Sequence, residues 1–68
     1  MMNGLVIKRG DLYLARKQCS TSKPDGAGNC WSVELQAARV YQSYALARKR
    51  AKECGGVVRT MADGRLKD

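Results

Sequence analysis

The residues that could carry out chemistry are few and lie far apart in this 68-residue chain, which has no histidine. Acid–base catalysis needs two titratable groups held close together, and a cysteine without a base partner is a poor nucleophile. The carboxylates fall in predicted turns, at exposed positions and near the end of the chain: Asp11, Asp25, Glu34, Glu53, Asp63 and Asp68. We therefore expect no enzymatic activity.

The cysteines are Cys19, Cys30 and Cys54, and no two of them have the spacing of a zinc knuckle or a redox motif. A metal site made of all three thiolates is one alternative, but no histidine is present to complete it. We favour free thiols in a reducing compartment, with no metal and no cofactor. Cys54 is expected to be a small core residue, whereas Cys19 and Cys30 flank a loop and could be joined by oxidation.

The strongest feature is a run of cations, residues 48–52, in a segment that favours helix. At helical spacing its charges cover about 200° of the circumference. Tyr44, Ala47, Ala51 and Cys54 are left to face a sheet, although Leu46 falls among the charges. Glu53 alone offsets the run locally, so we interpret it as a phosphate-binding surface and not only as a solvated helix face. The predicted nucleic-acid-binding residues are Arg39, Arg48, Lys49, Arg50 and Lys52.

The overall charge points in the same direction, because the chain carries a formal +7 and has a pI of about 9.8. A basic balance of this size favours nucleic acid as a partner, although charge also serves solubility. A second basic set would protect sheet edges from strand addition: Lys8, Arg9, Arg16 and Lys17. Among the aromatic residues that could stack on bases, we assign Trp31 to the core and leave Tyr13 and Tyr44 open.

The elements that would position these residues begin with two β-type runs, 5–9 and 12–16, around Gly10–Asp11. This pattern predicts a hairpin, and glycine in the first turn position suits a type II′ turn. Residues 18–29 are rich in small and polar residues and predict one long loop with a turn at 24–26. A further strand is predicted over 57–61.

Residues 31–54 allow two interpretations. One is a single long helix from Val33, capped by Ser32. The other ends an extended piece at Trp31–Ser32, makes a turn over 34–37 and a short strand over 38–41, and then starts a helix of about three turns after Ser43. We favour the second because Val40 and Tyr41 prefer strands. In both, the glycines at 55–56 end the helix.

The predicted fold is α+β, with a small antiparallel sheet of three to four strands packed against one helix in the order β-β-(β)-α-β. Residues 1–61 form the single domain, and 62–68 form a flexible tail. One apolar sheet face would be covered by the helix. The expected core is Leu5, Ile7, Leu12, Leu14, Val58, Ala47 and Ala51, with Trp31 and Tyr41 at its edges.

Part of this pattern resembles many small uncharacterised proteins of bacteriophages and prophages. The motifs are Tyr13-Leu14, Trp31, the segment 38–43, Ala47, Ala51, the glycines 55–56 and the valines 57–58. Those proteins share a strand containing tryptophan, an Ala-Arg-x-aromatic segment, a short helix and a Gly-Gly-Val-Val ending. The resemblance loosely covers residues 5–61. It implies a phage or prophage origin and the same order of elements, but no activity.

A weaker similarity is to the DNA-binding domains at the start of phage integrases, in which three antiparallel strands precede a helix and enter the major groove. Residues 41–43 followed by Ala47 are similar to the aromatic-x-Thr then Ala junction of those domains. This chain departs from them in having a strand, 57–61, after its helix. Pairing of that strand within the sheet would change the groove-reading geometry.

From these observations we expect a cytoplasmic phage-type accessory protein that contacts DNA or RNA electrostatically. Its longest early apolar run, residues 5–7, is too short for a secretory signal or a membrane span. An alternative is an interaction module or inhibitor that binds a host or phage protein through a sheet edge or the 18–29 loop. A homodimer formed through the 57–61 edge is a further possibility.

Overall fold

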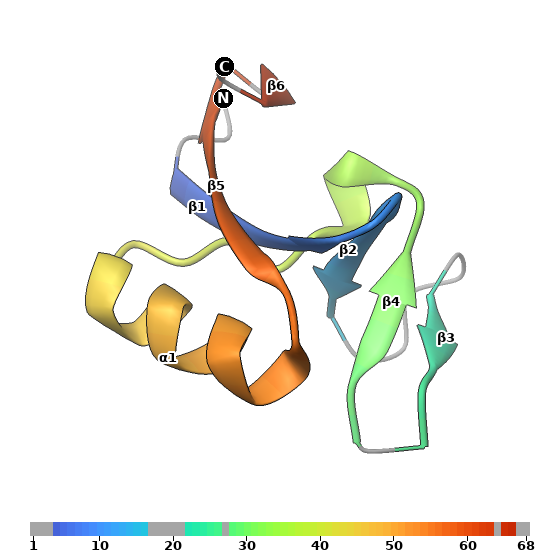
Figure 1. Cartoon of the computed structure of the whole chain (residues 1–68). Helices are drawn as coiled ribbons and strands as arrows, with labels where there is room; N and C mark the ends of the chain where they lie inside the picture. The colour runs from blue at the N-terminus through green and yellow to red at the C-terminus, as the bar shows by residue number, and fades with distance from the viewer. Residues whose placement is uncertain (1–3, 17–21, 27, 64, 67–68) are drawn as a thin grey trace.

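Within the residues that the structure describes, six strands form one antiparallel sheet in the order β3-β4-β2-β1-β5-β6, with a single α-helix beside it (Figure 1). The computed structural model describes residues 4–16, 22–26, 28–63 and 65–66. Their elements are β1 (Gly4–Arg9), β2 (Leu12–Ala15), β3 (Lys23–Pro24), β4 (Cys30–Ser32), a 3-10 helix η1 (Leu35–Ala37), α1 (Tyr44–Cys54), β5 (Val57–Ala62) and β6 (Arg65–Leu66). The α+β class with one helix is confirmed, but the prediction of three to four strands is too low.

The extended piece expected to end at Trp31–Ser32 is strand β4, and two further strands that the sequence did not predict are very short. β3 lies within the 18–29 segment expected to be loop and pairs Lys23 with Trp31. β6 lies within the 62–68 segment expected to be a tail and pairs Leu66 with Met61. Each has two residues, too few to show an alternating pattern, and each is held in place by a longer neighbouring strand.

The predicted hairpin at Gly10–Asp11 is confirmed. β1 and β2 pair Arg9 with Leu12 across a two-residue turn. Gly10 has φ of +62°, as the first position of a type II′ turn requires. On its other side β1 pairs with β5 along most of its length, from Gly4 opposite Met61 to Lys8 opposite Val57. β1 is therefore a central strand.

The predicted third strand over 38–41 is an extended segment that lies between β1 and β2. Pairing of β1 with β2 stops at Lys8 and Tyr13, and the two strands then diverge. Leu5 and Tyr41 exchange backbone hydrogen bonds of 2.8 and 2.7 Å, and the Arg39 amide donates to the Leu14 carbonyl at 2.8 Å. The segment contributes isolated bridges and not a continuous strand.

α1 begins and ends where the preferred interpretation placed it, so the single long helix from Val33 is wrong. The Ser43 hydroxyl accepts a hydrogen bond from the Leu46 amide at 3.4 Å, which caps the first turn. Gly55 has φ of +75°, the left-handed conformation that ends a helix, and the Gly56 amide donates to the Ala51 carbonyl. The turn expected over 34–37 is η1.

Both faces of the sheet are covered, which corrects the prediction of a single apolar face. The helix side holds the expected cluster: Ile7, Leu14, Trp31, Ala51 and Cys54, with Leu12, Tyr41 and Val58 partly buried against it. The opposite side holds a second cluster of Val6, Ala38 and Met61, which the sequence analysis missed. Residues 35–40, the connection before α1, supply its cover through Leu35, Ala38 and Val40.

No helix within the described residues is long and apolar enough to cross a membrane.

The junction between α1 and β5 generates a stability prediction. A Cβ added at Gly56 would lie 2.7 Å from Cγ2 of Ile7 and 3.0 Å from the Lys8 carbonyl oxygen. Because Ile7 is fully buried, neither neighbour can move freely. We expect Gly56→Ala to lower the free energy of unfolding by about 1–3 kcal/mol, measured by urea denaturation. Val57→Ala, at the exposed neighbouring position, is the control, and an equal effect of the two would contradict this packing.

Candidate nucleic-acid interface

The solvent-facing side of α1 carries most of the predicted site. Ala47, Ala51 and Cys54 are buried against the sheet, as expected. Arg48, Lys49 and Lys52 are exposed. Because the buried residues are all small, the helix lies close to the sheet and turns most of its circumference toward solvent.

Tyr44 does not face the sheet, which corrects the sequence expectation. It is 59% exposed and precedes Arg48 by four residues, so it continues the same side of the helix as Arg48 and Lys52. Leu46, expected among the charges, is 62% exposed and lines a hollow together with Lys49 and Arg50. The exposed surface of α1 is therefore both basic and apolar.

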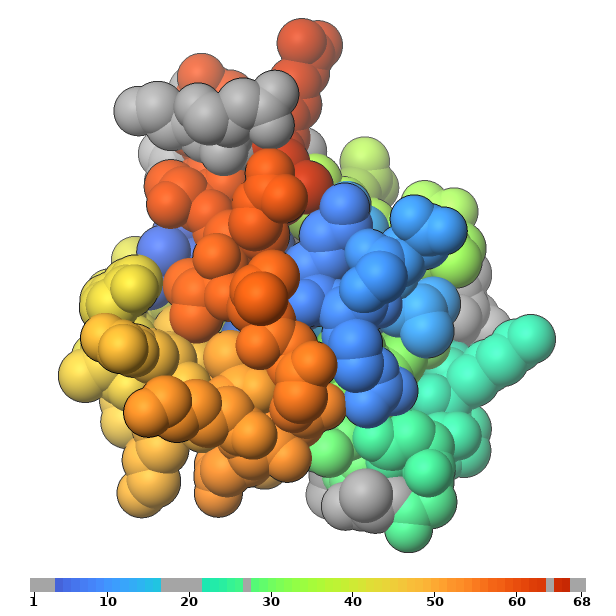
Figure 2. All heavy atoms as spheres, in the orientation of Figure 1, coloured from blue at the N-terminus to red at the C-terminus, as the bar shows by residue number. Residues whose placement is uncertain are grey.

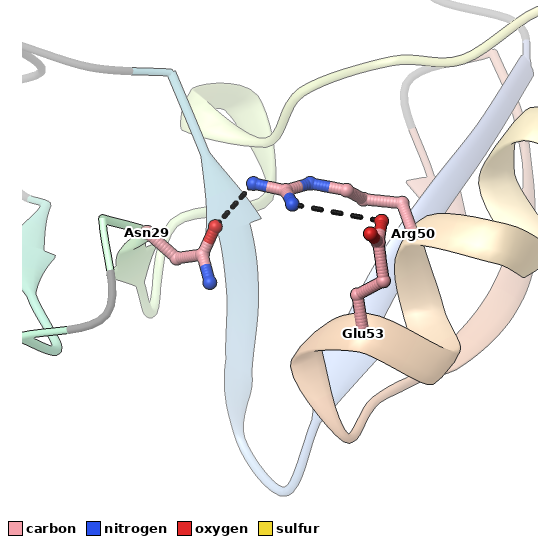
Figure 3. Close-up of polar contacts among 3 residues, drawn as sticks. All are labelled: Asn29, Arg50 and Glu53. Carbon is pink, nitrogen blue, oxygen red and sulfur yellow. Dashed lines mark hydrogen bonds and ion pairs between the residues drawn. The ribbon is translucent and has the colours of Figure 1, made fainter.

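Arg50 differs from the other predicted site residues because its guanidinium is engaged within the molecule (Figure 3). Nη2 donates a hydrogen bond to Oδ1 of Asn29, in the connection between β3 and β4, and Nη1 lies 3.8 Å from Oε1 of Glu53. Asn29 is 9% exposed, so this contact joins α1 to a largely buried side chain of that connection. Arg50 is half-buried and fixes the connection against the helix.

Arg39 lies on the extended segment before α1, with its guanidinium carbon 5.6 Å from the centroid of the Tyr41 ring. The structure brings it together with Lys49 and Arg50 around one shallow hollow, which is also lined by Tyr41, Leu46 and Glu53. Glu53 places a carboxylate in this hollow, so its positive charge is partly balanced.

Arg48 and Lys52 lie around a different hollow, between α1 and β5, and no carboxylate is among the described residues that line it. Lys49 lines the first hollow and also shares a third shallow surface with Tyr44, Arg48 and Lys52. The five predicted residues therefore form two neighbouring groups joined at Lys49, not one continuous patch.

The exposed cations of α1 have no acidic partner within the part of the chain that the structure describes. Glu53 lies beside Arg50, and Oδ2 of Asp25 accepts a hydrogen bond from Nε1 of Trp31 at 2.8 Å. No carboxylate of the described ranges lies within ion-pair distance of Arg48, Lys49 or Lys52. These three side chains direct a positive field into solvent, where it can attract a polyanion.

Arg9 has a structural role that sequence reasoning missed. Its Nη1 donates to the Cys54 carbonyl at 3.1 Å, at the C-terminal end of α1, and its guanidinium carbon lies 4.1 Å from the Trp31 ring centroid. A cation is favourable at that end of a helix. The edge-guarding role proposed for the first-hairpin cations is wrong for Lys8 and Arg9, because β1 is a central strand. Lys17 lies outside the described residues.

The described part of the chain contains no group of three His, Cys, Asp or Glu side chains that could hold a metal ion. Cys30 is a partly buried free thiol and Cys54 a buried one. Cys19, which the sequence analysis paired with Cys30 as an oxidation candidate, lies outside the described residues.

Comparisons with family models, curated proteins and solved structures found no match to this chain. The arrangement of its own side chains is therefore the basis for the function proposed below.

The contacts of Arg50 generate a prediction that separates it from its neighbour Lys49. Arg50→Gln removes the guanidinium that contacts Asn29 and Glu53, so we expect the free energy of unfolding to fall by about 1–2 kcal/mol. Lys49→Gln removes an exposed charge that has no such partner in the described part of the chain, and its free energy of unfolding should stay within about 0.5 kcal/mol of the parent protein. Urea denaturation measures both, and equal effects would show that Arg50 does not fix the connection.

Proposed function

We propose that this protein binds nucleic acid electrostatically through the exposed side of α1. Arg48, Lys49 and Lys52 make the principal phosphate contacts, and Arg39 extends the surface past Lys49. The observation that carries the proposal is that these three helix cations are exposed and have no carboxylate partner within the described ranges. Arg50, in contrast, acts by holding the β3–β4 connection against the helix.

The energetics of such binding follow from the phosphate backbone. Each cation that neutralises a phosphate releases condensed counterions, so affinity falls steeply as salt rises. The net charge of +7 adds long-range attraction that raises the rate of encounter. Contacts of this kind position a protein on nucleic acid without reading base sequence. We assign the chain the role of a cytoplasmic accessory protein of a phage or prophage, not an enzyme.

The described sheet edges support nucleic acid over a protein strand as the partner. Both edge strands, β3 and β6, have two residues, and β3 contains Pro24, which has no amide to donate. The edge proposed for a homodimer, 57–61, is partly occupied because Met61 pairs with Leu66 of β6. These features disfavour recognition by strand addition at the β3 and β6 edges.

A salt titration tests the proposal. The parent protein should bind random-sequence DNA and RNA, with log K falling linearly with log salt. The triple variant Arg48→Gln, Lys49→Gln, Lys52→Gln should weaken binding to every sequence and reduce that slope by about two to three. Fluorescence anisotropy of labelled oligonucleotides at several salt concentrations measures both quantities.

The matched control removes three exposed cations elsewhere, as Arg16→Gln, Lys23→Gln, Arg65→Gln. This control has the same net charge as the helix variant but leaves the α1 cations in place. It should therefore keep most of the affinity and salt slope of the parent protein. Equal losses in the two variants would show that net charge, not the α1 surface, drives binding. Failure of duplex and single-stranded probes to bind the parent protein at low salt would refute the function.

A further inference from the structure

The hollow between α1 and β5 combines exposed apolar surface with cations that have no acidic partner among the described residues. The two elements lie next to each other on the face shown in Figure 2, α1 in yellow to orange and β5 in orange to red. The hollow is lined by Tyr44, Arg48, Ala51, Lys52, Gly56, Val57 and Val58. It is shallow and opens to solvent.

Two of its lining residues are exposed hydrophobic residues that do not pack in the core. Tyr44 and Val57 are each 59% exposed, and neither belongs to either core cluster. Single exposed apolar residues are common on protein surfaces, but these two border the same hollow as Arg48 and Lys52. Phosphate contact alone explains Arg48 and Lys52 and leaves Tyr44 and Val57 without a role.

We propose that the occupant of this hollow is single-stranded nucleic acid, with an unpaired base stacked on the ring of Tyr44 and with Val57 offering apolar contact to the strand farther along the hollow. This inference rests on the proposed electrostatic function and specifies its ligand. An unpaired base has a flat apolar face that aromatic side chains bind irrespective of its identity. In a duplex the base faces are stacked on one another, so the hollow would meet only backbone and groove edges.

The spacing of the cations suits this ligand. Tyr44, Arg48 and Lys52 are four residues apart, so each lies about 6 Å from the next along one side of the helix. Arg48 adjoins the stacking ring, and Lys52 extends the basic surface toward the start of β5. A strand whose base stacks on Tyr44 thus has cations beside it for its neighbouring phosphates, the combination found in surfaces that bind single strands without sequence preference.

The test compares three probes of equal length: a mixed-sequence DNA single strand, its duplex, and the same single strand with abasic sites in place of several nucleotides. The abasic strand keeps its phosphates but loses stackable bases. The parent protein should bind the intact strand more tightly than either other probe. Tyr44→Leu should weaken binding of the intact strand roughly 5- to 100-fold and leave its salt slope unchanged. Tyr44→Phe, which keeps the ring, should stay within about twofold.

The affinity for the duplex and for the abasic strand should change little in Tyr44→Leu, because neither probe offers a free base face at this hollow. Because Tyr44 is exposed, we expect both variants to keep the fold. Circular dichroism and urea denaturation of each variant test this. Equal binding of intact and abasic strands, or equal losses for single strand and duplex in Tyr44→Leu, would overturn the stacking inference and leave electrostatic binding standing. Absence of binding to all three probes would overturn both.

Discussion

The backbone hydrogen bonds of residues 38–41 fix the position of everything that follows them. β1 and β2 pair only next to their turn, and beyond it their inner edges carry donors and acceptors that need partners. The extended segment supplies them, through two bonds between Leu5 and Tyr41 and one from Arg39 to Leu14. Because Ser43 lies only two residues after Tyr41, this pairing sets where α1 begins and which side of it meets the sheet.

The same segment explains how so short a chain covers a sheet on both faces. Successive residues of an extended segment point to opposite sides, so Ala38 and Val40 reach one core cluster while Tyr41 reaches the other. α1 then needs to cover only the remaining face, which it does through small residues. A helix with so narrow a buried stripe leaves a wide exposed surface, and on this surface the cations lie.

Local chemistry made the ends of the elements predictable. Ser43 and Gly55 specify helix boundaries through bonds and torsions within a few residues, and Gly10 does the same for the hairpin. The contacts of Arg9 and Arg50 were not predictable because they join residues 45 and 21 positions apart. Val6 was missed because it lies in an apolar run, 5–7, which has no alternation to show that both faces are buried.

The candidate site shows the same division between local and distant information. The position of the cations on one helix followed from their spacing, since four charges in five residues must cover much of the circumference. Tyr44 was misplaced because it lies one turn from both the buried Ala47 and the exposed Arg48, at the border of the buried stripe. A helical pattern defines such a stripe well at its centre and poorly at its borders, where the neighbouring strand decides exposure.

Pairing within the molecule, more than the number of cations, decides which side of α1 carries the excess positive charge. Glu53 lies on the Arg50 side of α1, where it contacts a guanidinium already bound to Asn29. Among the described residues, the charge without an acidic partner is therefore on the side of Arg48, Lys49 and Lys52, which lie within about one Debye length of each other at physiological salt, so that their fields add. Tyr44 and Val57 are exposed on that same side. A ligand that carries negative charge and flat apolar faces in alternation along its length is the one that can use both.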